Sequence, residues 1–146
     1  MAAGPSDRAP KLVEVLLFWP PTWFVARLML VSAYVLGGAA KLADWPGAVA
    51  EQAHFGVYPP ALWAALTISV ELGGSLLVLS GRFVWLGAAL LGGFTLAAAV
   101  IANKFWTLVG TERFHATNAF FEHVVLAGAF IIVALVVALI PRATQE

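Results

Sequence analysis

The 146 residues of the chain are 62% hydrophobic and 11% charged, their net charge is zero, and they include no cysteine. Soluble domains carry about 25% charged residues, so this composition excludes a soluble globular protein. Zero net charge leaves no basic surface for nucleic acid, and without cysteine the chain carries neither disulfides nor thiolate metal sites.

The apolar residues fall in four long blocks, each near the ~20 residues that cross a bilayer as a helix. These blocks predict an all-α protein, a transmembrane four-helix bundle with short interfacial helices, whose first partner is the lipid bilayer. We divide the chain into an N-terminal tail and interfacial helix (1–21), a four-helix transmembrane domain (22–140) and a C-terminal tail (141–146).

The first part contains a short apolar run, residues 11–19. It is flanked by Asp7 and Glu14 and is followed by two prolines without a small-residue cleavage site, which argues against a signal peptide. We therefore expect a helix lying in the membrane interface, with Trp19 and Trp23 at headgroup level.

The first span is predicted over residues 22–42. One face of this helix carries both of its cations, because intervals of four and three residues connect Arg27, Val31, Tyr34, Gly38 and Lys41. In the following connection, residues 48–54 are expected to form one or two helical turns in the interface.

The second span, residues 61–80, carries a carboxylate near its centre, Glu71. An ionisable group in hydrocarbon costs several kcal/mol and requires a partner, water or a proton. Its polar residues share one helix face, which is formed by Ala64, Thr67, Glu71, Ser75, Val78 and Arg82. Glu71 is therefore the first candidate for a functional residue.

The third span is predicted over residues 83–102 and the fourth over residues 117–140, ended by Pro141. The third has a face of small residues, Ala88, Gly92, Thr95, Ala99 and Ala102, against which another helix can pack closely. The first two turns of the fourth span carry Asn118, Glu122 and His123.

The orientation follows from the cations that flank the spans. Four spans place both termini on one side, together with Arg8, Lys11, Arg82 and Arg142, whereas the opposite side has Lys41, Lys104 and Arg113. The positive-inside rule therefore predicts cytoplasmic termini, in a bacterial cytoplasmic (inner) membrane.

Depth along the helices suggests how the polar groups meet. Glu71 lies roughly 15 Å below the outer surface and Arg27 about 7 Å deeper, a difference that an Arg side chain can cover, so we expect these two to pair. Lys41, Lys104, Asn118, Glu122 and His123 are expected to ring a pocket above them. The candidate intramembrane polar site is Arg27, Tyr34, Lys41, Thr67, Glu71, Ser75, Asn118, Glu122 and His123.

Other interpretations remain for these residues. The Arg27–Glu71 pair can serve packing alone, Lys41 and Lys104 can be anchors that reach toward the headgroups, and His123 can bond between helices. Only His123 lies within a span, so one chain cannot supply two axial haem ligands, and no ligand spacing supports a metal site. We predict no metal and no covalently bound cofactor.

Four patterns in order resemble the DoxX family of small four-helix membrane proteins. These are Arg27, the run GGAAKLADW (37–45), the turn HFGVYPP (54–60) followed by ELGGSLLVLSGR (71–82), and FFEHVVLAGAF (120–130). The likeness extends over residues 22–140, although family members usually carry Lys-Asn where this chain has Glu122 and His123.

The resemblance implies a link to quinone chemistry, because relatives are named for a terminal quinol oxidase or tied to quinone reduction. It makes the chain a candidate accessory subunit of a quinone-dependent oxidoreductase, binding a quinone, a redox-protein partner or a second copy. The chain itself has no self-contained catalytic or cofactor motif. The alternatives are a non-catalytic scaffold or assembly factor and a small proton-coupled transporter, against which the unbroken spans count.

Overall fold

The computed structural model describes residues 9–143, with the side chains of residues 9–139. In this part of the chain every element is helical: α1 (Lys11–Leu17), α2 (Pro20–Ala43), α3 (Trp45–His54), α4 (Pro60–Ser80), α5 (Val84–Ala102), the short 3-10 helix η2 (Phe105–Thr107) and α6 (Gly110–Ala143). Asp7, Arg8, the side chain of Arg142 and the end of the predicted C-terminal tail lie outside the described residues.

Four helices, α2, α4, α5 and α6, are long and apolar enough to cross a membrane, which confirms the predicted all-α transmembrane fold. The first three agree with the expected spans to within two residues because their ends have clear local signals. Prolines occupy the first turns of α2 and α4, where a missing N–H costs nothing. Gly81 ends α4 in the left-handed conformation, with φ 74°.

The fourth span differs from its predicted bounds of 117 to 140. Helix α6 begins at Gly110 and continues to Ala143, beyond Pro141. Its first turns are polar, but Glu112 lies in the first turn, where a carboxylate is favoured by the helix dipole. At 1.5 Å per residue, α6 is about 51 Å long, so it extends well beyond a ~30 Å hydrocarbon core.

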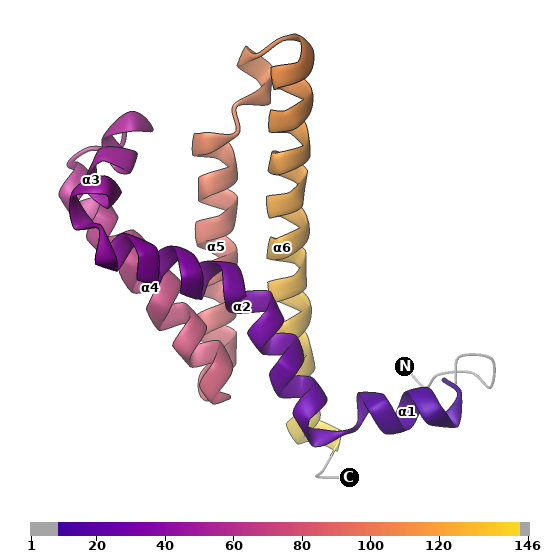
Figure 1. The fold of residues 1–146 in the computed structure, drawn as a ribbon. Coiled ribbons are helices and arrows are strands. Elements are labelled where there is room, and N and C mark those ends of the chain that lie inside the picture. Colours follow the sequence, from indigo (N-terminus) through magenta and orange to yellow (C-terminus); the bar gives the residue numbers. More distant parts are fainter. Residues whose placement is uncertain (1–8, 144–146) are drawn as a thin grey trace.

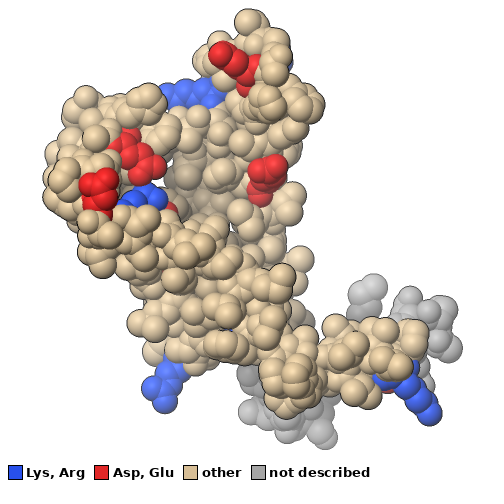
Figure 2. Space-filling view, viewed as in Figure 1, with Lys and Arg blue, Asp and Glu red and all other residues tan. Residues whose placement is uncertain are grey.

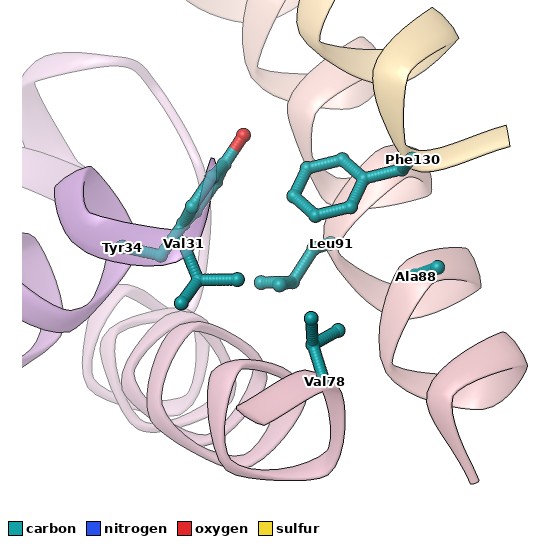
Figure 3. Packing of buried hydrophobic residues seen from close by; sticks show 6 residues of the cluster. All are labelled: Val31, Tyr34, Val78, Ala88, Leu91 and Phe130. Atoms are coloured by element: carbon teal, nitrogen blue, oxygen red, sulfur yellow. The ribbon is translucent and has the colours of Figure 1, made fainter. Parts of the chain in front are cut away.

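The core is a single cluster to which all four long helices contribute (Figure 3). Its fully buried members include Leu91 and Phe130, and Tyr34 meets the Phe130 ring edge-on at a centroid distance of 5.6 Å. The six residues shown are Val31, Tyr34, Val78, Ala88, Leu91 and Phe130. Val31, Tyr34, Val78 and Ala88 lie on the helix faces predicted from spacing, whereas Arg82 and Ala102, at the ends of the predicted faces, are exposed.

Small residues bring α4 and α5 together. A Cβ placed on Gly87 would lie 2.7 Å from the Gly74 carbonyl oxygen, and one on Gly74 would lie 2.8 Å from Leu91 Cγ. Real Cβ atoms do not approach this closely, so both positions require glycine for the backbones to touch. In lipid, where apolar surface gains little from helix pairing, such close packing is the main source of association.

The bundle is open toward one end. Helices α5 and α6 run side by side, whereas α2 crosses diagonally and, with α3 and the start of α4, forms a second lobe (Figure 1). The lobe and the α5–α6 pair meet near the end that carries α1 and separate toward the other end. Figure 2 shows a hollow between them, with acidic and basic side chains on the lobe.

The two short helices have different surroundings. Helix α1 projects sideways from the bundle (Figure 1) and buries none of its residues, so its place in the membrane interface stays a prediction. Helix α3 packs against α4 and α2, and its Ala48 is only 3% exposed. The expected turn of helix at 48–54 is therefore longer, beginning at Trp45, and belongs to the lobe.

Candidate functional site

The centre of the candidate site is an ion pair between α2 and α4. The Lys41 ammonium lies 3.2 Å from Glu71 Oε1 and 3.4 Å from Oε2, so it donates to both carboxylate oxygens. The Glu71 side chain is only 7% exposed and that of Lys41 is 19% exposed. Lys41 thus supplies the counter-charge that a buried carboxylate requires. A partner for Glu71 was expected, but the expected cation was Arg27.

The two helices approach closely at this level because of a glycine. Gly38 is buried, and a Cβ there would lie 2.8 Å from Leu72 Cγ and 3.2 Å from Glu71 Cβ. With no side chain between them, α2 and α4 can bring Lys41 and Glu71 within hydrogen-bond distance. The alternative interpretation of Lys41 as an anchor toward the headgroups is therefore wrong.

A second carboxylate, Glu51 of α3, lies near the same ammonium. The distance from Lys41 Nζ to Glu51 Oε2 is 3.9 Å, and the Glu51 side chain is 44% exposed. Asp44 caps α3 by accepting a hydrogen bond from the Gly47 backbone N–H at 3.0 Å, which sets the direction of this helix.

Sequence reasoning missed Glu51. A signal was present, because Glu51 follows the buried Ala48 by three residues and so shares its helix face. Short helices in connections are hard to place from sequence, and whether this face meets α2 depends on how the connection folds back.

The predicted pair of Arg27 with Glu71 is wrong. Arg27 Nη1 donates to the Val78 carbonyl at 2.9 Å, and its guanidinium lies 5.4 Å from the centroid of the Trp23 ring. Val78 is in the last turn of α4, where carbonyls have no partner within the helix. Since Val78 is seven residues past Glu71, about 10 Å along the helix, Arg27 is level with the end of α4.

Two of the other predicted residues of α2 and α4, Tyr34 and Ser75, form hydrogen bonds within the bundle. Tyr34 Oη and Thr95 Oγ1 are 2.6 Å apart and hydrogen-bonded between α2 and α5, while the Thr95 hydroxyl also lies 2.6 Å from the Leu91 carbonyl. Ser75 donates to the Glu71 carbonyl one turn earlier, and Thr67 is buried on the same face. These bonds satisfy polar groups that lipid could not.

The residues predicted on the fourth span are not brought into contact with the pair. Asn118 and Glu122 are exposed and line an open cavity of about 470 Å³ with Phe121, Val125 and Leu126. His123 Nδ1 lies 2.6 Å from the Ala119 carbonyl of its own helix, to which it donates. Lys104 is exposed.

The predicted ring of five residues therefore does not form in the described part of the chain. Only Lys41 from that ring contacts Glu71, and no hydrogen bond or ion pair among the described residues joins Asn118 or Glu122 to them. Asn118 and Glu122 belong to α6, which packs mainly against α5, whereas Lys41 and Glu71 belong to α2 and α4.

This arrangement has defined chemistry. The Lys41 ammonium can donate a hydrogen bond and the Glu71 carboxylate can accept one or take up a proton, so a ligand with a carbonyl and a hydroxyl fits both. Among the described residues, no three His, Cys, Asp or Glu side chains gather in a group that could hold a metal ion.

Comparison with known proteins places the chain in a family. The DoxX family model matches residues 22–104, which is more than half of the chain and includes α2 to α5 with both members of the ion pair. The FFEHVVLAGAF pattern at 120–130 lies beyond the matched range. The inner membrane protein YphA of Escherichia coli (strain K12) is 28% identical over 116 residues, covering 80% of this chain and 83% of that protein. No solved structure matches the chain significantly. From its four spans and this family match, we conclude that the chain is an integral membrane protein of the DoxX family.

Proposed function

We propose that this protein is an accessory subunit of a quinone-linked redox system and that a quinone head group binds at the Lys41–Glu71 pair. The observation that carries the proposal is the pair itself, a carboxylate and an ammonium held between two membrane-spanning helices, with side chains that are only 7% and 19% exposed. Intramembrane ionisable groups are costly and tend to mark functional sites.

The chemistry of the pair suits a quinone and its quinol. A quinone carbonyl accepts a hydrogen bond from the Lys41 ammonium, and a quinol hydroxyl donates one to the Glu71 carboxylate. Reduction of the quinone takes two electrons and two protons; a redox-protein partner supplies the electrons, and Glu71 passes protons to or from the head group.

We assign the protein to the bacterial inner membrane with both termini in the cytoplasm. The relative from Escherichia coli is described as an inner membrane protein, which supports this location. Helix α1 and the end of α6 lie at the same end of the bundle (Figure 1). Lys11 is the first residue of α1, and Arg82 lies in the turn between α4 and α5, which the order of the spans assigns to the same side. The charge distribution supports the orientation.

A scaffold without a ligand is the second candidate, and one observation favours it. In the part of the chain that the structure describes, every fully buried side-chain nitrogen and oxygen has a hydrogen-bond partner. A site that awaits a ligand often leaves such an atom unpaired, whereas a purely structural network satisfies all of them.

Purification in mild detergent, followed by mass spectrometry of bound quinones and co-purifying proteins, separates the two candidates. We expect the wild type to retain quinone and Glu71→Gln to lose it while remaining folded by circular dichroism. Glu112→Gln, at an exposed carboxylate in the first turn of α6, is the matched control and should retain quinone. Partner proteins without quinone, unchanged in Glu71→Gln, would favour the scaffold.

A further inference from the structure

Two adjacent glycines of α2 have different surroundings. Gly38 packs against α4, where a Cβ would collide with Leu72 at 2.8 Å. At Gly37, a Cβ would lie 3.5 Å from Lys41 Nζ and 3.6 Å from each Glu71 carboxylate oxygen, which are ordinary contact distances. Packing therefore explains the glycine at position 38, but not the one at position 37.

A glycine that packing does not require has a cost. Glycine in a helix interior is less favourable than alanine, because its backbone loses more conformational freedom when the helix forms. Alanine at position 37 would also cover part of a charged pair that is expensive to leave open to lipid. Because glycine has no side chain, position 37 places no methyl group over the Lys41–Glu71 pair. Gly37 itself is only partly buried.

We infer that Gly37 is an opening through which one oxygen of a ligand head group reaches the Lys41–Glu71 pair. The inference rests on the proposed function and deepens it, because it names the residue that determines which head groups fit. The space that a missing methyl leaves admits a single carbonyl or hydroxyl oxygen at the ion pair, the group that a quinone or quinol presents at its ring edge.

The position of Gly37 on α2 supports this assignment. It follows Tyr34 by three residues and precedes Lys41 by four, so the three share a helix face. Tyr34 reaches across to Thr95 of α5, whereas Lys41 reaches Glu71 of α4. Gly37 therefore lies between the residue of α2 that bonds to α5 and the residue of α2 that bonds to α4.

The affinity test compares alanine substitutions at two glycines, Gly37 and Gly73. Gly37→Ala meets no atom closer than 3.5 Å, so it should fold, and Gly73→Ala is the control because nothing lies within 4 Å of its Cβ. Titration of purified protein with decylubiquinone should show at least tenfold weaker binding for Gly37→Ala and a change below twofold for Gly73→Ala. Equal binding by Gly37→Ala and wild type would overturn the opening, while leaving the quinone site itself standing.

Chemical labelling provides a second test that does not depend on affinity. The chain has no cysteine, so Gly37→Cys and Gly73→Cys each give one reactive thiol. N-ethylmaleimide, which enters membranes, should modify both variants, and decylubiquinone should slow the reaction at least fivefold in Gly37→Cys alone. No modification of folded Gly37→Cys, or equal protection in both variants, would contradict the inference.

If wild type, Gly37→Ala and Glu71→Gln all fail to bind decylubiquinone, the proposed function fails and the inference fails with it.

Discussion

The two cations of α2 show how one helix face serves two different ends of the bundle. Near the start of the helix, Arg27 donates to the Val78 carbonyl at the end of α4, beside the packed core. Near the end of the helix, Lys41 neutralises the buried Glu71 at the level where the bundle opens. One cation satisfies a neutral backbone group and the other a full charge, so their removal should have unequal consequences.

The largest effect is expected for Lys41→Met. It leaves Glu71 buried without its counter-charge, and breaking a buried pair on one side costs about 3–5 kcal/mol. The double variant Lys41→Met/Glu71→Gln removes both charges and should recover more than half of the lost free energy of unfolding. Unfolding in mixed SDS micelles measures both; a single variant as stable as the double would contradict a buried, paired Glu71.

Gly87→Ala probes the packed half of the molecule in the same assay. Its new Cβ would lie 2.7 Å from the Gly74 carbonyl oxygen, so α4 and α5 must separate, at about 1–3 kcal/mol for overpacking. Gly93→Ala, where nothing lies within 4 Å, is the control and should be neutral or stabilising. Equal stability of the two variants would mean that α4 and α5 do not touch as described.

For Arg27→Met we expect a loss of about 1.5–3 kcal/mol, since it removes a charged donor from a helix-end carbonyl. The loss should be smaller than that of Lys41→Met, because a carbonyl without a partner costs less than a charge without one. Arg27→Lys, which can still donate to Val78, should recover part of it. A larger loss for Arg27→Met than for Lys41→Met would reverse the comparison between the two cations.

The smallest effect is expected for Glu51→Gln. Glu51 is half-exposed and 3.9 Å from Lys41 Nζ, and pairs of this kind contribute about 0–1 kcal/mol. The free energy of unfolding should therefore change by less than 1 kcal/mol, and the bound quinone should be retained. Loss of stability as large as in Lys41→Met would show that Glu51, and not Glu71, is the main partner of the ammonium.

Much of the fold could be predicted because it depends on local properties of the chain. Blocks of apolar residues mark the four spans, and prolines and Gly81 mark their ends. The inward face of α2 was predicted from spacing alone, and Val31, Tyr34 and Gly38 are indeed buried. The start of the fourth helix was misplaced because its polar first turns extend beyond the bilayer-length run of apolar residues.

The candidate site was predicted in its residues but not in its pairing. Counting depth from the ends of the spans treats the helices as parallel rods that end at common levels, and on that basis Arg27 lies within reach of Glu71. In the structure α2 crosses diagonally (Figure 1), and the free carbonyls of the α4 end compete for Arg27. Neither effect is visible in a single helix.

Hydrophobic length and helical periodicity are local properties, so the amino-acid sequence alone was enough to identify a four-span helical membrane protein with a carboxylate that needs a partner. The packing of the helices determines that the partner is Lys41 and that Glu51 lies 3.9 Å from the same ammonium, and the opening inferred at Gly37 depends on the same packing. These contacts depend on the crossing angle of the helices and on the small residues at the crossing. The crossing exists only when the helices pack against one another.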